Sequence, residues 1–206
     1  MKNSVLIARA TAAAAVIGLL AALAASTASA ATPAPCPAQT IVRPFLPWGD
    51  SNNYFLAPEG SMESTSTWSL SNASRVTDNE PFHVNSPLDK SALSLGSSGS
   101  ATTAPICVTV HSPTLRLFVR NLGSPTSALR VDVLFTNKYG LPAQAPVTYL
   151  TAGSSWSLSS EVSFLKAVTT AVNANDQTWV RFRFTPVGWG GNWRLDDLFV
   201  DPLKGV

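Results

Sequence analysis

The sequence predicts an all-β protein, an antiparallel β-sandwich made of short strands. Residues 129–135 alternate strictly: Leu129, Val131 and Val133 are separated by Arg130 and Asp132, as in a strand with one face on a core. Residues 179–185 alternate in the same way, and Gly, Pro, Asn and Ser separate these segments at short intervals. About eight to ten such segments are present, a number typical of sandwiches and jelly rolls.

The expected strands follow one another through the whole chain after residue 67. Residues 121–127 are expected to be a hairpin loop, and residues 161–172 fit either a helix or a strand, with a strand and a loop favoured because a sandwich has little room for a helix. The strands are expected at residues 68–71, 74–77, 91–95, 106–110, 115–120, 129–135, 147–150, 155–158, 179–185 and 195–200.

The first 30 residues have the features of a secretory signal peptide. Lys2 and Arg9 form a positive start, residues 11–25 are apolar, and residues 28–30 form an Ala-Ser-Ala cleavage site. The apolar run is short for a membrane span. We therefore expect a secreted, extracellular protein with a signal peptide (1–30), a flexible Ala- and Pro-rich arm (31–44) and one sandwich domain (45–206).

The two cysteines, Cys36 and Cys107, are expected to form one disulfide bond, because an even number in an exported chain favours pairing. The bond would close a loop of about 70 residues and stabilise the fold by roughly 4 kcal/mol. The alternative is two free thiols serving a metal or acting as a nucleophile. No Cys or His stands at ligand spacing from either of them.

The charge of the chain argues against a polyanionic partner. The full sequence has 14 basic and 12 acidic residues, and removing Lys2 and Arg9 with the signal peptide leaves 12 of each. The mature net charge is therefore about zero, and no run of basic residues remains. This balance excludes nucleic acid and anionic membranes as the expected partners.

The stretch of residues 187–202 is a glycine-rich turn followed by the closing strand. Asp196 and Asp197 stand together at the start of that strand, where aspartate is normally depleted. Two explanations are possible: a hard cation such as Ca²⁺, which collects carboxylate oxygens, or side chains that accept hydrogen bonds from local backbone amides.

Residues 193–200 resemble the last strand of galactose-binding-like jelly rolls, a family that includes many carbohydrate-binding modules. Residues 57–70 are similar to the Gly-Phe-Glu…Trp opening of the same family, although Met62 replaces the usual aromatic residue. The resemblance covers about residues 45–202. It implies a jelly roll whose first and last strands lie together, often with a structural Ca²⁺ between them. The matching ligands are Glu63 and Asp196, with Asp197 or Asp50 as helpers.

The resemblance also implies carbohydrate as the ligand. Sugar rings pack on aromatic side chains, and their hydroxyl groups bond to polar ones. Of the six tryptophans, Trp189 and Trp48 are expected to be exposed in loops, with Tyr54 and Tyr139 next. The expected polar partners are Asn192 and Arg194, with Asn52 and Asn53 also available. Trp68 and Trp193 are expected in the core.

No catalytic motif is visible in the sequence. There is no Gly-x-Ser-x-Gly, and the two histidines, His83 and His111, are not placed like metal ligands or a catalytic base. The sequence therefore favours a secreted, non-catalytic protein that recognises carbohydrate or a cell-surface polysaccharide, with one structural Ca²⁺ and no membrane span. The alternatives are an extracellular structural or adhesive protein that binds another protein, and an unrecognised hydrolase.

Overall fold

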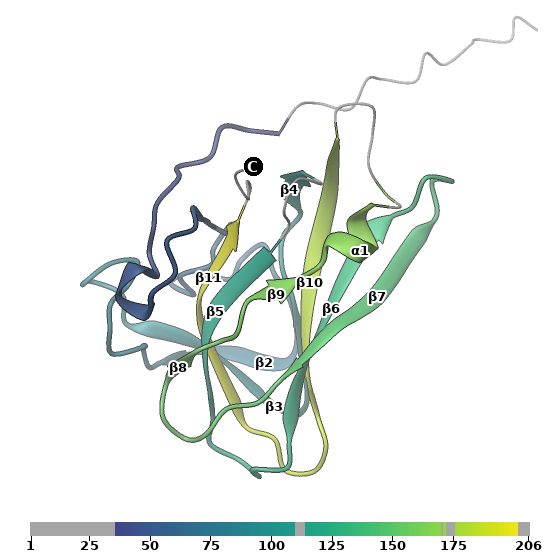
Figure 1. Cartoon of the computed structure of the whole chain (residues 1–206). Helices are drawn as coiled ribbons and strands as arrows, with labels where there is room; N and C mark the ends of the chain where they lie inside the picture. Colours follow the sequence, from purple (N-terminus) through teal and green to yellow (C-terminus); the bar gives the residue numbers. More distant parts are fainter. Residues whose placement is uncertain (1–35, 110–113, 170, 172–175, 202–206) are drawn as a thin grey trace, which may run out of the picture. The chain divides into compact units, whose positions relative to one another are not determined.

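The computed structural model describes residues 36–109, 114–169, 171 and 176–201 (Figure 1). The predicted signal peptide, the first part of the arm and His111 lie outside these residues. The elements are η1 (Leu46–Trp48), β1 (Phe55–Leu56), β2 (Ser69–Thr77), β3 (Ser91–Thr102), β4 (Ile106–Thr109), β5 (Thr114–Asn121), β6 (Ala128–Thr136), β7 (Pro142–Leu150), β8 (Ser157–Leu158), β9 (Val162–Ser163), α1 (Leu165–Val168), β10 (Gln177–Val187) and β11 (Trp193–Asp201).

The strands form two layers, and the predicted all-β fold is confirmed. One layer has the order β2, β3, β11, β5, with β1, β8 and β9 at its margins; the other has the order β7, β6, β10, β4. Every pairing between these strands is antiparallel. Strand β3 joins the layers, because it pairs with β11 at residues 93–95 and with β10 at residues 101–102 (Figure 1). Within the described residues, no helix is long and apolar enough to cross a membrane.

The core lies between the two layers and is filled by alternate residues of each strand. Strand β6 contributes Leu129, Val131 and Val133, as the sequence predicts. Strand β10 contributes Val180, Phe182 and Phe184, of which Phe182 packs edge-on against Phe164 with ring centroids 4.7 Å apart. Trp68 and Trp193 are buried, as expected. Burial of this apolar surface is the main force that holds the layers together.

The closing strand β11 is buried along almost its whole length and contains a β-bulge. Trp193 and Leu195 face the core, and after the bulge at residues 196–199 the core positions become Leu198 and Val200. The extra residue is Asp197, whose φ angle is +45°. The strand expected at residues 195–200 is present, but its side chains do not alternate regularly, because a bulge places two residues of one strand opposite a single partner residue.

The opening segment lies directly on β11, as the resemblance implied. Phe55 pairs with Val200. The amide of Ala57 donates to the carbonyl of Leu198 (2.9 Å), and the amide of Leu198 donates to the carbonyl of Gly60 (2.9 Å). A side chain on Gly60 would place its Cβ 2.6 Å from the Leu198 carbonyl oxygen, so this approach requires glycine.

Two local predictions need correction. Residues 121–127 do not form a hairpin loop, since β5 pairs with β11 while β6 pairs with β10, and the segment instead crosses from one layer to the other. Residues 161–172 contain a short strand and also a helical turn, whereas a strand and a loop were expected. A two-residue strand, β9, precedes one helical turn, α1, whose Val168 closes one end of the core.

The predicted disulfide bond between Cys36 and Cys107 is present, with the two Cα atoms 5.5 Å apart. It ties the arm to β4. Further along the arm, Val42 forms a bridge with Tyr54, each amide donating to the other carbonyl over 2.8 Å. The part of the arm from Cys36 to Pro44 is therefore held at both ends against the sandwich.

Replacing both cysteines by serine should destabilise the fold without changing it. The bond joins residues separated by 71 positions, so its loss frees the unfolded chain and should lower the free energy of unfolding by roughly 4 kcal/mol. Urea unfolding of the wild type and of the double variant Cys36→Ser/Cys107→Ser measures this. Equal midpoints with equal slopes would show that the bond contributes no stability.

Candidate functional site

The outer face of the β3–β11–β5 layer brings three polar side chains into one row. Arg194 of β11 stands opposite Arg120 of β5 on one side and Ser94 of β3 on the other. Side chains alternate along a strand, so these three point away from Trp193 and Leu195 and the core.

The two arginines share one carboxylate, which comes from the loop between β2 and β3 (residues 78–90, the β2–β3 loop). A guanidinium nitrogen of Arg120 (Nη2) pairs with Asp78 Oδ2, and Arg194 Nε lies 3.7 Å from the same oxygen. Arg194 Nη1 also donates to Ser94 Oγ and to Asn192 Oδ1, both at 2.7 Å. The predicted pair Asn192 and Arg194 is therefore in direct contact and fixed in one geometry.

Trp156 completes this group and was not predicted as part of it. The guanidinium carbon of Arg120 lies 5.1 Å from the centre of the Trp156 ring, a cation–π contact. Trp156 Nε1 and Arg120 Nε are both buried and have no hydrogen-bond partner among the described residues. The sequence signal was weak, because Trp156 precedes a strand of two residues, β8, which pairs with β5.

Trp189 projects from the loop between β10 and β11 and is 92% exposed, as expected. Gly188 and Gly190 on either side have φ angles of +87° and +67°, which glycine adopts without strain. The loop is nevertheless well anchored: the Ser124 amide donates to the Gly190 carbonyl (2.8 Å), and the Leu122 amide donates to the Asn192 carbonyl (2.7 Å). A hollow of about 370 Å³ lies beside the Trp189 ring and is also lined by Ser97 of β3.

Trp48 is also partly exposed, at 36%, but it belongs to a different cluster. Its ring packs edge-on against Phe82 and Phe118, with centroids 5.1 Å and 5.3 Å away. Phe82 is itself about half exposed. Trp48 is thus a partly buried ring that packs on Phe118, whereas Trp189 is almost fully exposed.

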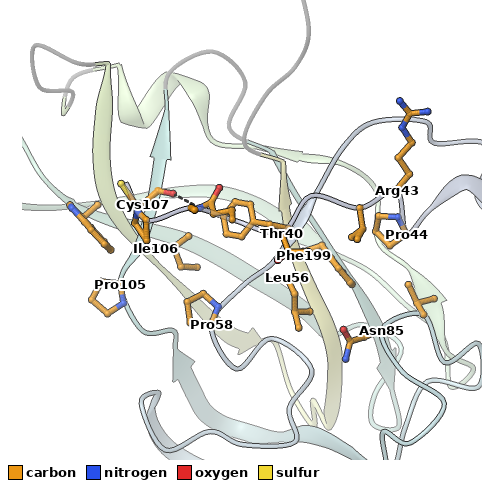
Figure 2. Close-up of a pocket in the computed structure, with 17 residues that line it drawn as sticks. Thr40, Arg43, Pro44, Leu56, Pro58, Asn85, Pro105, Ile106, Cys107 and Phe199 are labelled. Carbon is orange, nitrogen blue, oxygen red and sulfur yellow. Dashed lines mark hydrogen bonds between the residues drawn. The ribbon is translucent and has the colours of Figure 1, made fainter. Parts of the chain in front are cut away.

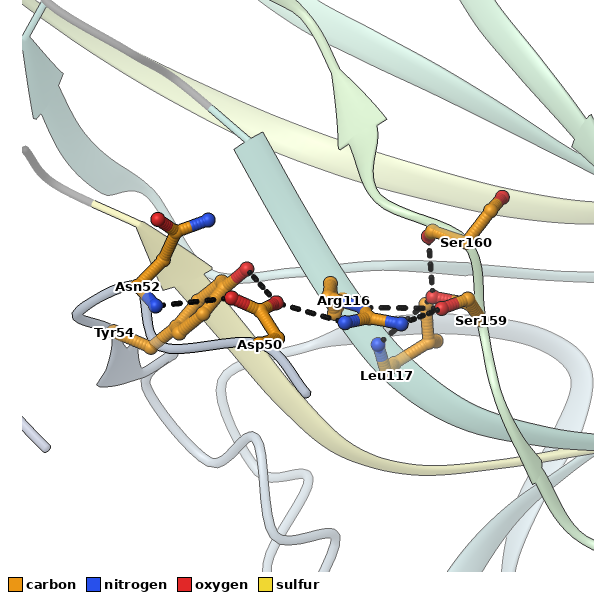
Figure 3. A network of polar contacts seen from close by, with 7 residues as sticks. All are labelled: Asp50, Asn52, Tyr54, Arg116, Leu117, Ser159 and Ser160. Carbon is orange, nitrogen blue, oxygen red and sulfur yellow. Dashed lines mark hydrogen bonds and ion pairs between the residues drawn. The ribbon is translucent and has the colours of Figure 1, made fainter. Parts of the chain in front are cut away.

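The exposure predicted for Tyr54 is wrong, because its ring is fully buried. Figure 3 shows the reason: the Tyr54 hydroxyl donates to Asp50 Oδ2 (2.8 Å), and Arg116 Nη1 donates to the same oxygen (2.7 Å). Arg116 in turn donates to the carbonyl of Ser159. Tyr54 and Asp50 therefore hold the segment that follows the arm on β5. Of the other predicted polar residues, Asn52 donates its backbone amide to Asp50, and Asn53 accepts from Arg43. Tyr139 is exposed on the β6–β7 turn.

The residues expected to bind calcium make other contacts. Glu63 Oε1 accepts hydrogen bonds from the amides of Lys90 (2.6 Å) and Ser91 (2.7 Å). Asp196 Oδ2 accepts from the Glu80 amide (3.0 Å), and its Oδ1 accepts from the Asp197 amide (2.9 Å). Among the described residues, no three His, Cys, Asp or Glu side chains are arranged to hold a metal ion. The calcium site expected from Glu63 and Asp196 therefore stays a prediction, and in this structure both carboxylates accept hydrogen bonds from backbone amides.

Asp196, Asp197 and Glu80 form a buried group of carboxyls instead. Both oxygens of Glu80 accept hydrogen bonds from the backbone amides of Phe82 and Val84, and Asp197 Oδ2 accepts from the Asn85 amide (3.1 Å). Asp197 Oδ1 is buried without a hydrogen-bond partner. Burial is the main cause that raises the pKa of Asp196 to about 8 and that of Asp197 to about 7. The charges of neighbouring carboxyls act in the same direction, and the hydrogen bonds from backbone amides act against it.

A separate cavity of about 600 Å³ lies beneath the arm (Figure 2). Its wall is mostly apolar, and the arm side is fixed where Gln39 Nε2 donates to the Cys107 carbonyl (3.3 Å). None of the predicted sugar-binding residues lines it. The cavity is lined by residues of the arm and by Cys107. It does not include the group formed by Arg194, Arg120, Ser94, Asp78, Asn192 and Trp156, which we call the Arg194 group.

The buried carboxyls should make the protein less stable as the pH rises. The pKa values of Asp196 and Asp197 in the folded state lie above the value of about 4 for a free aspartate. The folded state then keeps protons that the unfolded state releases, so this stabilisation is complete below about pH 4 and is lost as the pH rises towards 8. The melting temperature should be lower at pH 8.5 than at pH 5.

The variant Asp197→Asn isolates this effect, because asparagine tolerates the positive φ angle and cannot ionise. It should lose part of the fall in melting temperature between pH 5 and pH 8.5. An equal fall in the wild type and the variant would contradict the assignment. So would a rise in the wild-type melting temperature on adding Ca²⁺ at pH 8.5, since the carboxyls would then hold a cation rather than protons.

The chain is similar in fold to several solved structures. No protein-family model matches the sequence, and a comparison with curated proteins finds no match. Among solved structures, the tandem CBM22-1–CBM22-2 domains of Paenibacillus barcinonensis Xyn10C align with a TM-score of 0.51 at 8% identity, over 75% of this chain. The CBM22-1–GH10 modules of Clostridium thermocellum xylanase 10B align with a TM-score of 0.50 at 9% identity, over 71% of this chain.

This chain spans only part of the length of those proteins: 46% of the tandem and 28% of the xylanase modules. It spans 21% of the enzymatically active domain of bacteriophage CBA120 tailspike protein 4, which aligns with a TM-score of 0.47 at 13% identity over 70% of this chain. At such low identities the likeness concerns the fold alone. The chain has the jelly-roll fold of carbohydrate-binding modules.

Proposed function

We propose that this protein is secreted and binds a polysaccharide without cleaving it, through Trp189 and the polar group around Arg194. The observation that carries the proposal is the position of Trp189: its ring is 92% exposed on an anchored loop. Asn192 and Arg194 follow three and five residues later, with Arg194 on the outer face of β11. The jelly-roll fold supports the same class of ligand.

The chemistry of the group suits a sugar. The indole ring offers a flat apolar face to the C–H groups of a pyranose. Arg194 and Arg120 have only donors, whereas Asn192, Ser94 and Asp78 have acceptors, so a ligand with many hydroxyls meets both kinds. Because hydrogen bonds already hold Arg194 in place, little side-chain entropy is lost when a ligand binds.

The acidic residues support binding rather than hydrolysis. A glycosidase places two carboxyl groups on either side of the bond that it cleaves. Here the group formed by Glu80, Asp196 and Asp197 is buried and bonded to backbone amides, so it does not face a bound chain. Asp50 and Asp78 are each paired with arginine.

Secretion is supported by two independent features. The residues of the predicted signal peptide, 1–30, precede a domain that contains a disulfide bond. Disulfide bonds persist in oxidising compartments and are rare in the cytosol. Both features fit a protein that meets polysaccharides outside the cell.

The variant Trp189→Ala should weaken polysaccharide binding about 30-fold, which corresponds to the loss of about 2 kcal/mol at a central aromatic contact. Titration of the protein with soluble xylan, mixed-linkage β-glucan and galactan, followed by tryptophan fluorescence and by retardation in affinity gels, measures the effect. Arg194→Gln should weaken binding to the same polymer. The control is Tyr139→Ala, which removes another exposed ring and should leave the affinity unchanged.

Two results would overturn this assignment. Full affinity in Trp189→Ala together with lost affinity in Trp48→Ala would place the sugar on the Trp48–Phe82 cluster. No binding to any polymer, with protein partners retained from the extracellular medium in a Trp189-dependent way, would favour the adhesive alternative.

A further inference from the structure

The second layer carries a positively charged outer face. Alternation along β10 places Phe182 and Phe184 in the core and Arg181 and Arg183 on the opposite side. On the neighbouring strand β6, Arg183 stands opposite Asp132, and Arg130 stands opposite Thr185. The three arginines of this layer therefore share one surface, although the net charge of the mature chain is about zero.

The charges on this face are unbalanced. Strands β4, β6, β7 and β10 contain three arginines and one acidic residue, Asp132. Asp132 is buried, with its Oδ2 atom 3.0 Å from Arg130 Nε and 3.9 Å from Arg183 Nε. Arg183 also donates to Gln144 of β7. Arg181 is exposed and makes no ion pair within the described part of the chain.

The face of the other layer differs in this respect. Arg120 and Arg194 pair with Asp78 there, and Arg116 pairs with Asp50. Every one of those guanidinium groups has a carboxylate partner. On the second layer one carboxylate serves two arginines and the third arginine is left for a ligand.

A hollow lies beside the unpaired arginine. It has a volume of about 300 Å³ and is lined by Arg181, Trp179, Leu134, Phe135, Thr136, Val180 and Pro105. Trp179 is 44% exposed and stands two residues before Arg181 on the same strand. Successive outward residues of a strand are about 7 Å apart, so an apolar ring and a cation border one recess.

We propose that this recess binds an acidic polysaccharide, with the carboxylate of a uronic acid residue on Arg181 and its ring against Trp179. A guanidinium matches a carboxylate with two parallel N–H···O bonds, which a hydroxyl group cannot reproduce. Arg183 stands two residues further along β10, and it shares the single carboxylate of Asp132 with Arg130, so the surrounding charge is positive in sum. The surface is separate from Trp189, so the inference goes beyond the function proposed above.

The structure favours a uronate over a nucleic acid. Nucleic acids are bound by neutralising many phosphates, which takes a long row of lysines and arginines. The four strands of this layer provide three arginines, one of them unpaired, beside a recess of the size of a single ring. That arrangement selects one carboxylate at a time on a sugar with an apolar face.

Titration calorimetry with the full chain and polygalacturonate or alginate tests the proposal. The wild type should bind at low salt and should not bind the same polymer after its carboxyl groups have been reduced to alcohols. Arg181→Gln should weaken binding about tenfold, and Arg181→Lys should be intermediate because it keeps the charge but not the paired geometry. Trp179→Ala should weaken binding as well, with the melting temperature measured to confirm folding.

The controls separate this site from the Trp189 site. Arg43→Gln removes an exposed arginine of the arm and should leave uronate binding unchanged, as should Trp189→Ala. Full affinity in Arg181→Gln would overturn the proposal. So would equal binding of the carboxyl-reduced polymer, or equal binding of duplex DNA or anionic phospholipid vesicles, since recognition would then not depend on a sugar carboxylate.

Discussion

The carboxyl groups of Asp196 and Asp197 accept hydrogen bonds from backbone amides of the β2–β3 loop, and these bonds decide where that loop lies. The loop brings Asp78 to Arg120 and Arg194. It also brings Phe82 against Trp48. Both exposed clusters on this layer thus depend on two buried aspartates at a bulge. Such groups are costly to bury, and they persist because amide donors satisfy most of their oxygen atoms.

The bulge in β11 allows one strand to serve both sides of its layer. Before it, Trp193 and Leu195 face the core; after it, Leu198 and Val200 do so, while Phe199 turns outward to Phe45. The buried group of Phe45, Tyr54, Phe118 and Phe199 then forms a second, smaller core beneath the arm. The disulfide bond and this small core both fix the arm, so the chain is ordered beyond the sandwich itself.

The parts of the fold that depend on local alternation could be predicted from the sequence. Val131, Val133 and Phe182 are in the core because a period of two places them there. Tyr54 could not be assigned, because its burial depends on Asp50 and Arg116, and Arg116 is 62 residues further along the chain. The contact between Trp156 and Arg120 could not be predicted for the same reason, because the two residues are far apart in the sequence. Asn192 and Arg194, which the sequence suggests as polar partners of a sugar, are in contact because they stand two residues apart in the chain.

The net charge of about zero for residues 31–206 concealed the difference between the two faces. A net charge near zero argues against a positively charged surface only if the charges are spread evenly over the protein. The period of two instead gathers Arg181 and Arg183 on one side of β10, while the acidic residues of β11 are buried on the other layer. What a surface attracts is set by the arginines that lack a carboxylate partner, since paired charges largely cancel. By that measure the outer face of β10 offers the unpaired cation of Arg181, whereas Arg120 and Arg194 both pair with Asp78 and suit an uncharged sugar.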